Sequence, residues 1–246
     1  MEQFAVKPIV PMHIGHYDVS FTNQSLWMCI VVGCITLFMM MATSKRSVVP
    51  SRMQSMAELS YEFVANMVGT AAGEDGLRFF PLVFTLFMFV LFSNFLGLLP
   101  GSFTVTSQIV VTFAMAAFVI ATVIVTGFLK HGFRFLTLFV PKAPWYMAIP
   151  LTVIEFFSFC TRPISLSVRL FANMLAGHTL LKVFASFVIG LGGASALYFN
   201  ALAVVPFALI VAITLLELLV AALQAYVFAI LTCIYLNEAL HLHDHH

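Results

Sequence analysis

Charged residues are scarce in this chain: only 9% of its 246 residues are Asp, Glu, Lys or Arg, whereas 62% are hydrophobic. An ordinary soluble domain has about 25% charged residues, so this composition excludes a soluble protein and indicates an integral membrane protein. The formal net charge of +1 provides no basic surface for nucleic acid. We therefore expect membrane lipid and other membrane proteins as partners, and no nucleic acid.

Cysteine is also rare, and the four cysteines lack the spacing of a metal site. They all lie in apolar runs, at Cys29, Cys34, Cys160 and Cys233. We interpret them as small buried hydrophobic residues rather than disulfide partners. The terminal residues 241–246, "HLHDHH", are interpreted as a solvated tail. We expect neither a metal ion nor a cofactor.

The first half of the chain alternates between polar segments and apolar runs. A helix needs about 20 mainly apolar residues to cross about 30 Å of hydrocarbon. Residues 1–24 lack the basic start and apolar centre of a secretory signal, so we predict an external tail. Within a single membrane domain, 1–246, we then predict a first span at 25–42, a polar connection with an amphipathic surface helix at 43–79, and a helical hairpin at 80–129.

Two longer apolar runs lie between residues 144 and 240. Each is about 45 residues long, about twice the length needed for a simple crossing. Hydropathy alone allows two spans in each run or one long tilted helix. Because neither run contains a polar, turn-rich break, we favour a pair of long inclined helices. The predicted class is an all-α, multi-pass integral membrane protein.

Basic residues mark one side of the membrane. They gather in two of the connections, at Lys45, Arg46, Arg52, Lys130, His131, Arg134 and Lys142. The connection at 100–106 carries none. The positive-inside rule therefore predicts that the N-terminus lies outside and the C-terminus inside.

Polar residues inside the two long runs are aligned on helix faces. A helical wheel places five residues of the first run within about 40° of one direction: Glu155, Arg162, Ser165, Arg169 and Asn173. His178 falls near the opposite side. In the second run, Glu217 and Gln224 are seven positions apart and share a face.

An arginine at the bilayer centre costs about 2.5 to 3.5 kcal/mol on insertion scales. We therefore favour an ion or proton pathway for Arg169 over a structural role, in which Glu155 or backbone carbonyls would satisfy it. His178 and Glu217 can both exchange protons, whereas a guanidinium keeps its positive charge and cannot relay a proton. Arg169 is thus suited to attract a mobile carboxylate and to repel a passing proton.

Two segments resemble subunit a of the F-type ATP synthase. They are "RPISLSVRLFANMLAGH" and "LLELLVAALQAYVFAILTCIYLNEA", with a weaker resemblance through "SNFLGLLPG". The resemblance implies one N-terminal span, an amphipathic helix, a hairpin and two inclined helices that curve against a ring of c subunits. It makes Arg169 the arginine that faces the ring carboxylates, with Asn173 on the same face and Gln224 opposite it.

The same resemblance places His178 and Glu217 in the proton access channel from the outside. Many bacterial members carry the acid and the histidine in the reverse order, and the mitochondrial form has the order seen here. We therefore expect a bacterial lineage near the mitochondrial one, in the cell inner membrane, with the mitochondrial inner membrane as the alternative. Glu155, Arg162 and Ser165 are expected to form a supporting polar stripe.

The implied function is that of a stator subunit with two offset half-channels, not catalytic alone, that couples proton flow to ATP synthesis. The implied partners are the c-subunit ring, the b-type subunits of the peripheral stalk and the rest of the ATP synthase. The main alternative is a self-contained secondary transporter or ion channel with an intramembrane Arg/Glu/His site, but we find no internal repeat of the kind such proteins show. An intramembrane hydrolase is disfavoured because Ser165 and His178 lack a nucleophile motif.

Overall fold

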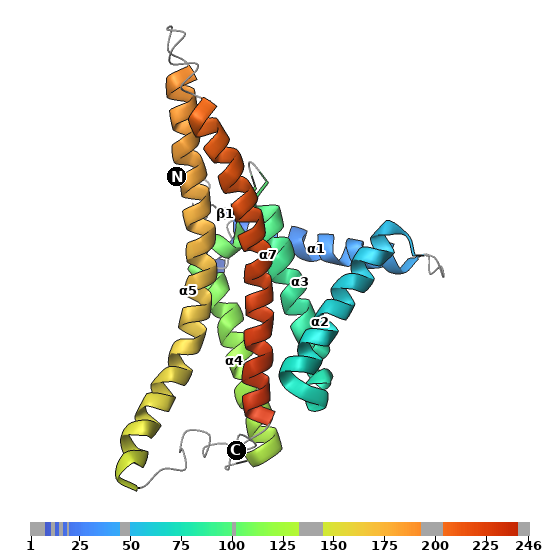
Figure 1. The fold of residues 1–246 in the computed structure, drawn as a ribbon, viewed down its shortest axis with the longest axis vertical. Coiled ribbons are helices and arrows are strands. Elements are labelled where there is room, and N and C mark those ends of the chain that lie inside the picture. Colours follow the sequence, from blue (N-terminus) through green and yellow to red (C-terminus); the bar gives the residue numbers. More distant parts are fainter. Residues whose placement is uncertain are drawn as a thin grey trace.

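The computed structural model describes residues 8–10, 13–14, 17–18, 20–44, 50–99, 102–132, 145–192 and 204–240. Nearly all of these residues are helical (Figure 1). Within these ranges, five helical stretches are long and apolar enough to cross a membrane: Asn23–Ser44, Arg52–Gly97, Ile109–His131, Pro150–Leu191 and Val204–Leu240. The predicted all-α, multi-pass class is therefore confirmed. The predicted tail at 241–246 lies outside the described residues.

Two short antiparallel strand pairs precede the first helix. Strand β1 (Pro8–Val10) pairs with β4 (Phe21–Thr22), and β2 (His13–Ile14) pairs with β3 (Tyr17–Asp18). They lie in the segment predicted as an external tail. The sequence analysis did not predict them, because strands of two or three residues leave no readable hydrophobic period.

Helix α1 (Asn23–Ser44) contains the predicted first span, and α2 (Arg52–Gly76) follows it. The two faces of α2 differ. Val64 and Val68 are buried, whereas Glu58 and Glu62 are exposed, as expected for an amphipathic helix. The rings of α2 also reach the rest of the bundle, since Phe63 lies 5.8 Å from both Phe87 and Tyr226 between ring centroids.

The regular geometry of α2 breaks at Gly73. Its backbone has φ 69° and ψ −170°, a conformation that L-residues with a side chain rarely adopt. The chain then continues through the 3₁₀ turn η2 (Leu77–Phe79) into α3 (Phe80–Gly97). The break therefore lets the chain change direction between the amphipathic helix and the first helix of the hairpin.

The predicted hairpin consists of α3, the 3₁₀ turn η3 (Val105–Ser107) and α4 (Ile109–His131). Its two helices do not pack mainly on each other. Helix α7 (Val204–Leu240) contacts both α3 and α4, and α4 also packs along α5 (Trp145–Gly192). The last helix of the chain is therefore a central element of the bundle.

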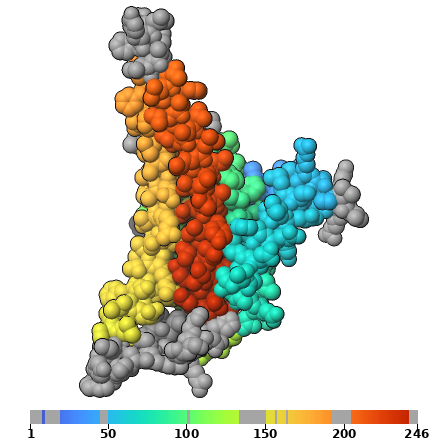
Figure 2. Space-filling view, viewed as in Figure 1, coloured from blue at the N-terminus to red at the C-terminus, as the bar shows by residue number. Residues whose placement is uncertain are grey.

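Each long apolar run forms one continuous helix. Helix α5 has 48 residues and α7 has 37, and at 1.5 Å per residue α5 extends about 72 Å. The two helices lie side by side over much of their length and cover one face of the molecule (Figure 2). This decides between the two interpretations that hydropathy allowed, in favour of long helices.

The outer surface of these helices is apolar. Phe157, Phe187, Leu215 and other large hydrophobic residues are exposed on α5 and α7, as expected for helices that face lipid or other membrane subunits.

The four cysteines differ in how exposed they are. Cys233 is buried, but Cys29 and Cys160 are exposed, so the prediction that all four are buried was wrong. Hydropathy cannot separate a lipid-facing position from a core position.

Candidate functional site

Glu217 is an ionisable residue buried in α7. Only 4% of its surface is exposed, and neither carboxylate oxygen has a hydrogen-bond partner among the residues that the structure describes. Burying a carboxyl group without partners is costly in a protein, and more so within a membrane. A position that keeps one therefore indicates function rather than packing.

His178 on α5 faces Glu217 across the helix interface. Its Nε2 atom lies 3.9 Å from Oε1 of Glu217, and their side chains are 16% and 5% exposed. The same Nε2 atom is 2.9 Å from the hydroxyl oxygen of Thr104, in the turn before α4. Helix α5, helix α7 and this turn thus meet around one imidazole. The two residues that the sequence analysis paired are neighbours in space, although 39 positions separate them.

Asn173 and Gln224 form a second contact between the long helices. The amide nitrogen of Asn173 donates a hydrogen bond of 3.1 Å to Oε1 of Gln224. Gln224 is buried, and its own amide nitrogen has no partner in the described part of the chain. The structure thus brings together two of the residues that the resemblance implied for the site.

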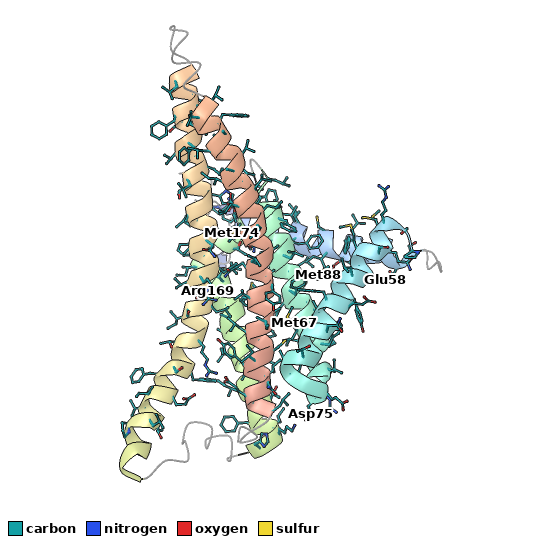
Figure 3. All side chains as sticks on the ribbon, viewed as in Figure 1. Glu58, Met67, Asp75, Met88, Arg169 and Met174 are labelled. Carbon is teal, nitrogen blue, oxygen red and sulfur yellow. The ribbon has the colours of Figure 1, made fainter. Side chains whose placement is uncertain are left out.

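Arg169 lies one turn before Asn173 on α5, beside α7 (Figure 3). Its side chain is exposed, and it makes no hydrogen bond or ion pair with any residue that the structure describes. The structural alternative offered Glu155 or backbone carbonyls as its partner, and Glu155 approaches Arg162 instead, at 3.8 Å. Among the described residues, the ion pair with Glu155 therefore belongs to Arg162 and not to Arg169.

Arg162 is held within the chain, in contrast to Arg169. It forms an ion pair with Glu238 of α7, and its guanidinium lies 5.0 Å from the ring centroid of Tyr235. Ser165, which the wheel placed on the same stripe, is exposed and makes no hydrogen bond to a described residue. In the predicted stripe, Arg162 and Asn173 therefore bond to α7, Glu155 approaches Arg162 on its own helix, and Ser165 and Arg169 are exposed.

The sequence analysis missed a buried polar group next to this site. Asn94 of α3 donates a hydrogen bond of 3.2 Å to the carbonyl oxygen of Ala221, and it accepts one of 2.9 Å from the hydroxyl of Thr106. Both polar residues are fully buried. A signal was present, because Asn94 is an amide within a Phe-rich apolar helix, where such groups usually bond to a neighbouring helix.

Glu238 was also missed as the partner of Arg162. It lies near the end of α7, where a charged residue is compatible with an exposed helix terminus and attracts no notice. Only the crossing of α5 and α7 shows that it faces an arginine 76 positions earlier in the chain.

Comparison with known proteins agrees with the resemblance seen in the two long helices. A family model described as "ATP synthase A chain" matches residues 25–237. The chain is 61% identical over 242 residues to ATP synthase subunit a of Chelativorans sp. (strain BNC1), covering 98% of this chain and 97% of the relative. It is 58% identical to ATP synthase subunit a of Mesorhizobium japonicum over 98% of this chain and 96% of the relative. The same identity is found with that of Rhizobium meliloti, over 97% and 96%.

Proposed function

This chain belongs to the ATP synthase A chain family and is a membrane subunit of a bacterial ATP synthase, and from this premise we propose that it forms two offset half-channels against a rotating ring of c subunits. The proposed membrane is the cell inner membrane, with the N-terminus outside and the C-terminus inside. The c-subunit ring and the b-type subunits of the peripheral stalk are the proposed partners. The chain supplies the proton path, and ATP is made elsewhere in the complex.

The outer half-channel passes His178 and Glu217. A proton arriving from outside is taken up by this pair and then passed to a carboxylate on a c subunit. Once neutral, that carboxylate can move into lipid without the penalty of burying a charge. The observation that carries this proposal is the buried carboxyl group of Glu217, without hydrogen bonds of its own, 3.9 Å from an imidazole.

Arg169 separates the two half-channels. It precedes His178 by nine residues on the same helix, which is about 13 Å along the axis at 1.5 Å per residue. Its exposed guanidinium attracts a ring carboxylate that has lost its proton, and its permanent charge repels a free proton. A proton therefore crosses the membrane only when it is bound to a carboxylate of the rotating c-subunit ring.

The inner half-channel opens toward the end of the bundle where α7 finishes. The imidazole of His131 at the end of α4 lies 3.1 Å from the carbonyl oxygen of Leu240, so the basic residues Lys130 and His131 lie near the end of α7. Glu155 and Arg162 lie between Arg169 and this end on α5. They provide polar side chains along the exit path, and the positive-inside rule makes this the inner side.

Proton flow through both half-channels supplies the energy for synthesis. A membrane potential of 100 mV provides about 2.3 kcal/mol per proton. Several protons must therefore be coupled to each ATP, and a leak past Arg169 would dissipate all of them. Membership of a family of ATP synthase subunits favours this rotary function over a self-contained transporter.

The test is the replacement of Arg169 in the complete ATP synthase, reconstituted in lipid vesicles. We expect Arg169→Ala to abolish ATP-driven proton pumping and to leave or increase passive proton flux. Arg169→Lys should fail as well, because a compact ammonium cannot span two carboxylates as a planar guanidinium does. Arg52→Ala, at an exposed arginine at the start of α2, is the control and should pump normally. Normal pumping by Arg169→Ala would overturn the proposal.

A further inference from the structure

We infer that Thr104 is a positioning residue for the proton-input pair: its hydroxyl group fixes the ring of His178 so that Nε2 faces Glu217. This inference rests on the proposed function of His178 and Glu217. Thr104 belongs to neither long helix, and it comes from the turn between α3 and α4. It therefore connects a third part of the fold to the site.

One arrangement of the Thr104 hydrogen bonds puts a proton on Nε2 of His178. The threonine hydroxyl has one hydrogen, and its oxygen lies 3.3 Å from the carbonyl oxygen of Gly97, which can only accept. When that hydrogen is donated to Gly97, the oxygen of Thr104 must accept from Nε2 of His178, 2.9 Å away. The neutral imidazole is then protonated on Nε2, the atom that also lies 3.9 Å from Oε1 of Glu217.

The turn is built to hold this hydroxyl in place. Backbone and side chain of Ser107 both donate to the carbonyl oxygen of Thr104, at 3.1 and 2.7 Å. Ser102 donates to the carbonyl oxygen of Gly97 at 3.1 Å. All of these side chains are buried, with Thr104 only 4% exposed. A residue that merely filled space would not require such a network of hydroxyl groups.

Gly97 allows the side chain of Thr104 to lie close against the backbone at the end of α3. A Cβ atom at position 97 would lie 2.7 Å from the methyl carbon of Thr104 and 3.2 Å from its hydroxyl oxygen. An alanine there would push Thr104 away from the carbonyl that it bonds. The lack of a side chain at Gly97, the glycine in "NFLGLLPG", is therefore needed for the hydroxyl group of Thr104 to keep its place.

The proposed consequence concerns proton transfer. With its ring fixed, His178 presents Nε2 both to Thr104 and toward Glu217. A proton that arrives at Nδ1 makes the ring an imidazolium, and the Nε2 proton can then pass to the Glu217 carboxylate, which leaves a neutral ring. Without the hydroxyl, the ring loses the contact that orients Nε2, and Nε2 is held less well toward Glu217. Removing the hydroxyl should therefore slow proton uptake while His178 itself remains.

The experiment measures passive proton flux through the reconstituted membrane sector, together with ATP-driven pumping by the whole complex. Thr104→Val keeps the shape and removes the hydroxyl, and we expect flux to fall about three- to tenfold, the loss typical of one neutral hydrogen bond. Thr104→Ser restores the hydroxyl and should return flux to within about twofold of normal. Thr232→Val is the matched control, since Thr232 is also buried but, within the described ranges, bonds to Phe228 on its own helix and not to the site, and its flux should be unchanged.

Two further variants separate positioning from packing. In the His178→Ala background, Thr104→Val should add no further loss, because Thr104 acts through the imidazole. Gly97→Ala should reproduce the loss of Thr104→Val, whereas Gly69→Ala, at a helical glycine with open space around it, should not.

The outcomes distinguish this inference from the function on which it rests. If His178→Ala and Glu217→Gln slow the flux but Thr104→Val does not, or if serine fails to rescue, the role of Thr104 is wrong and the input site stands. If Thr104→Val lowers flux equally with and without His178, Thr104 acts on packing and the inference is overturned. If neither His178→Ala nor Glu217→Gln changes the flux, the proposed input site itself is wrong.

Discussion

The carboxyl group of Glu217 lies directly against the backbone of Gly177, so that a Cβ atom at position 177 would be 2.7 Å from Cδ and 3.2 Å from Cγ of Glu217. Real Cβ atoms almost never come so close to another heavy atom. The buried Ala221 and Ala225 line the same side of α7. Small residues allow two membrane helices to approach closely, and here they leave room for one acidic side chain.

We predict that Gly177→Ala displaces Glu217 and slows passive proton flux about tenfold or more, with little loss of assembled complex. The added methyl group would overlap side-chain atoms of Glu217, which can rotate away, rather than the backbone of α7. The expected defect is therefore in proton transfer and not in folding. Gly190→Ala is the control on the same helix, because nothing lies near that position. Equal flux in both variants would show that Glu217 need not occupy its present place.

The helices could be predicted from the sequence because their apolar runs are long. Residues 25–42 lie within α1, and the two long apolar runs became the helices α5 and α7. The packing of α7 against α3 and α4 could not be predicted, because α3 and α4 are mostly apolar and show no polar stripe that would pair with the Glu217–Gln224 face of α7. The break at Gly73 was missed for a similar reason, since a lone glycine within a helical pattern is usually tolerated.

The site was predictable only where polar residues share one helix or match a family motif. Arg169 and Asn173 are four positions apart, so periodicity alone placed them together. The contacts of Asn94 with Ala221, and of Thr104 with His178, join segments 127 and 74 positions apart. No local pattern encodes such distances, and hydroxyl groups in a short turn are too common to attract attention.

Asn94 should be required for stability. Asn94→Ala leaves the buried hydroxyl of Thr106 without its acceptor and removes the bond to Ala221. An unsatisfied buried polar group costs about 1 to 3 kcal/mol, so the complex should lose its membrane sector at a temperature several degrees lower. Thermal unfolding of the detergent-solubilised complex measures this, with the exposed Asn66→Ala as control. Equal stability of both variants would contradict the prediction.

The ion pair between Arg162 and Glu238 should also stabilise the crossing of the long helices. Its side chains are 18% and 34% exposed, so we expect Glu238→Ala to reduce stability by about 1 to 2 kcal/mol, discounted for that exposure. Exchanging the charges, with Arg162→Glu and Glu238→Arg together, should recover at least half of the loss.

The matched control for that pair is Asp75, which bonds Lys130 at 2.5 Å on the surface, with side chains 56% and 38% exposed. Surface ion pairs contribute about 0 to 1 kcal/mol, so Asp75→Ala should have a smaller effect on the same thermal measurement. A larger loss for Asp75→Ala than for Glu238→Ala would reverse our ranking of the two pairs.

The last prediction is that His178 and Glu217 take up protons as one unit. Glu217 makes no hydrogen bond within the described part of the chain, and the imidazole of His178 faces it across the interface, at 3.9 Å. Each single change, Glu217→Gln and His178→Ala, should slow passive proton flux without uncoupling the complex, because the Arg169 barrier remains. Removing one partner already disables a shared path, so the double variant should lose much less than the product of the two single effects.

The measurement is passive proton flux through the reconstituted membrane sector, from pH 6 to 9, for the unchanged protein, both single variants and the double variant. Interacting groups titrate together, so each single change should also alter the pH profile of the flux. Arg52→Ala serves again as the neutral control, since its exposed side chain lies at the start of α2, away from the pair. Losses that multiply fully, with unchanged pH profiles, would mean that the two residues work independently. The contact between α5 and α7 would then hold two separate proton groups, and the assignment of a single input site would be wrong.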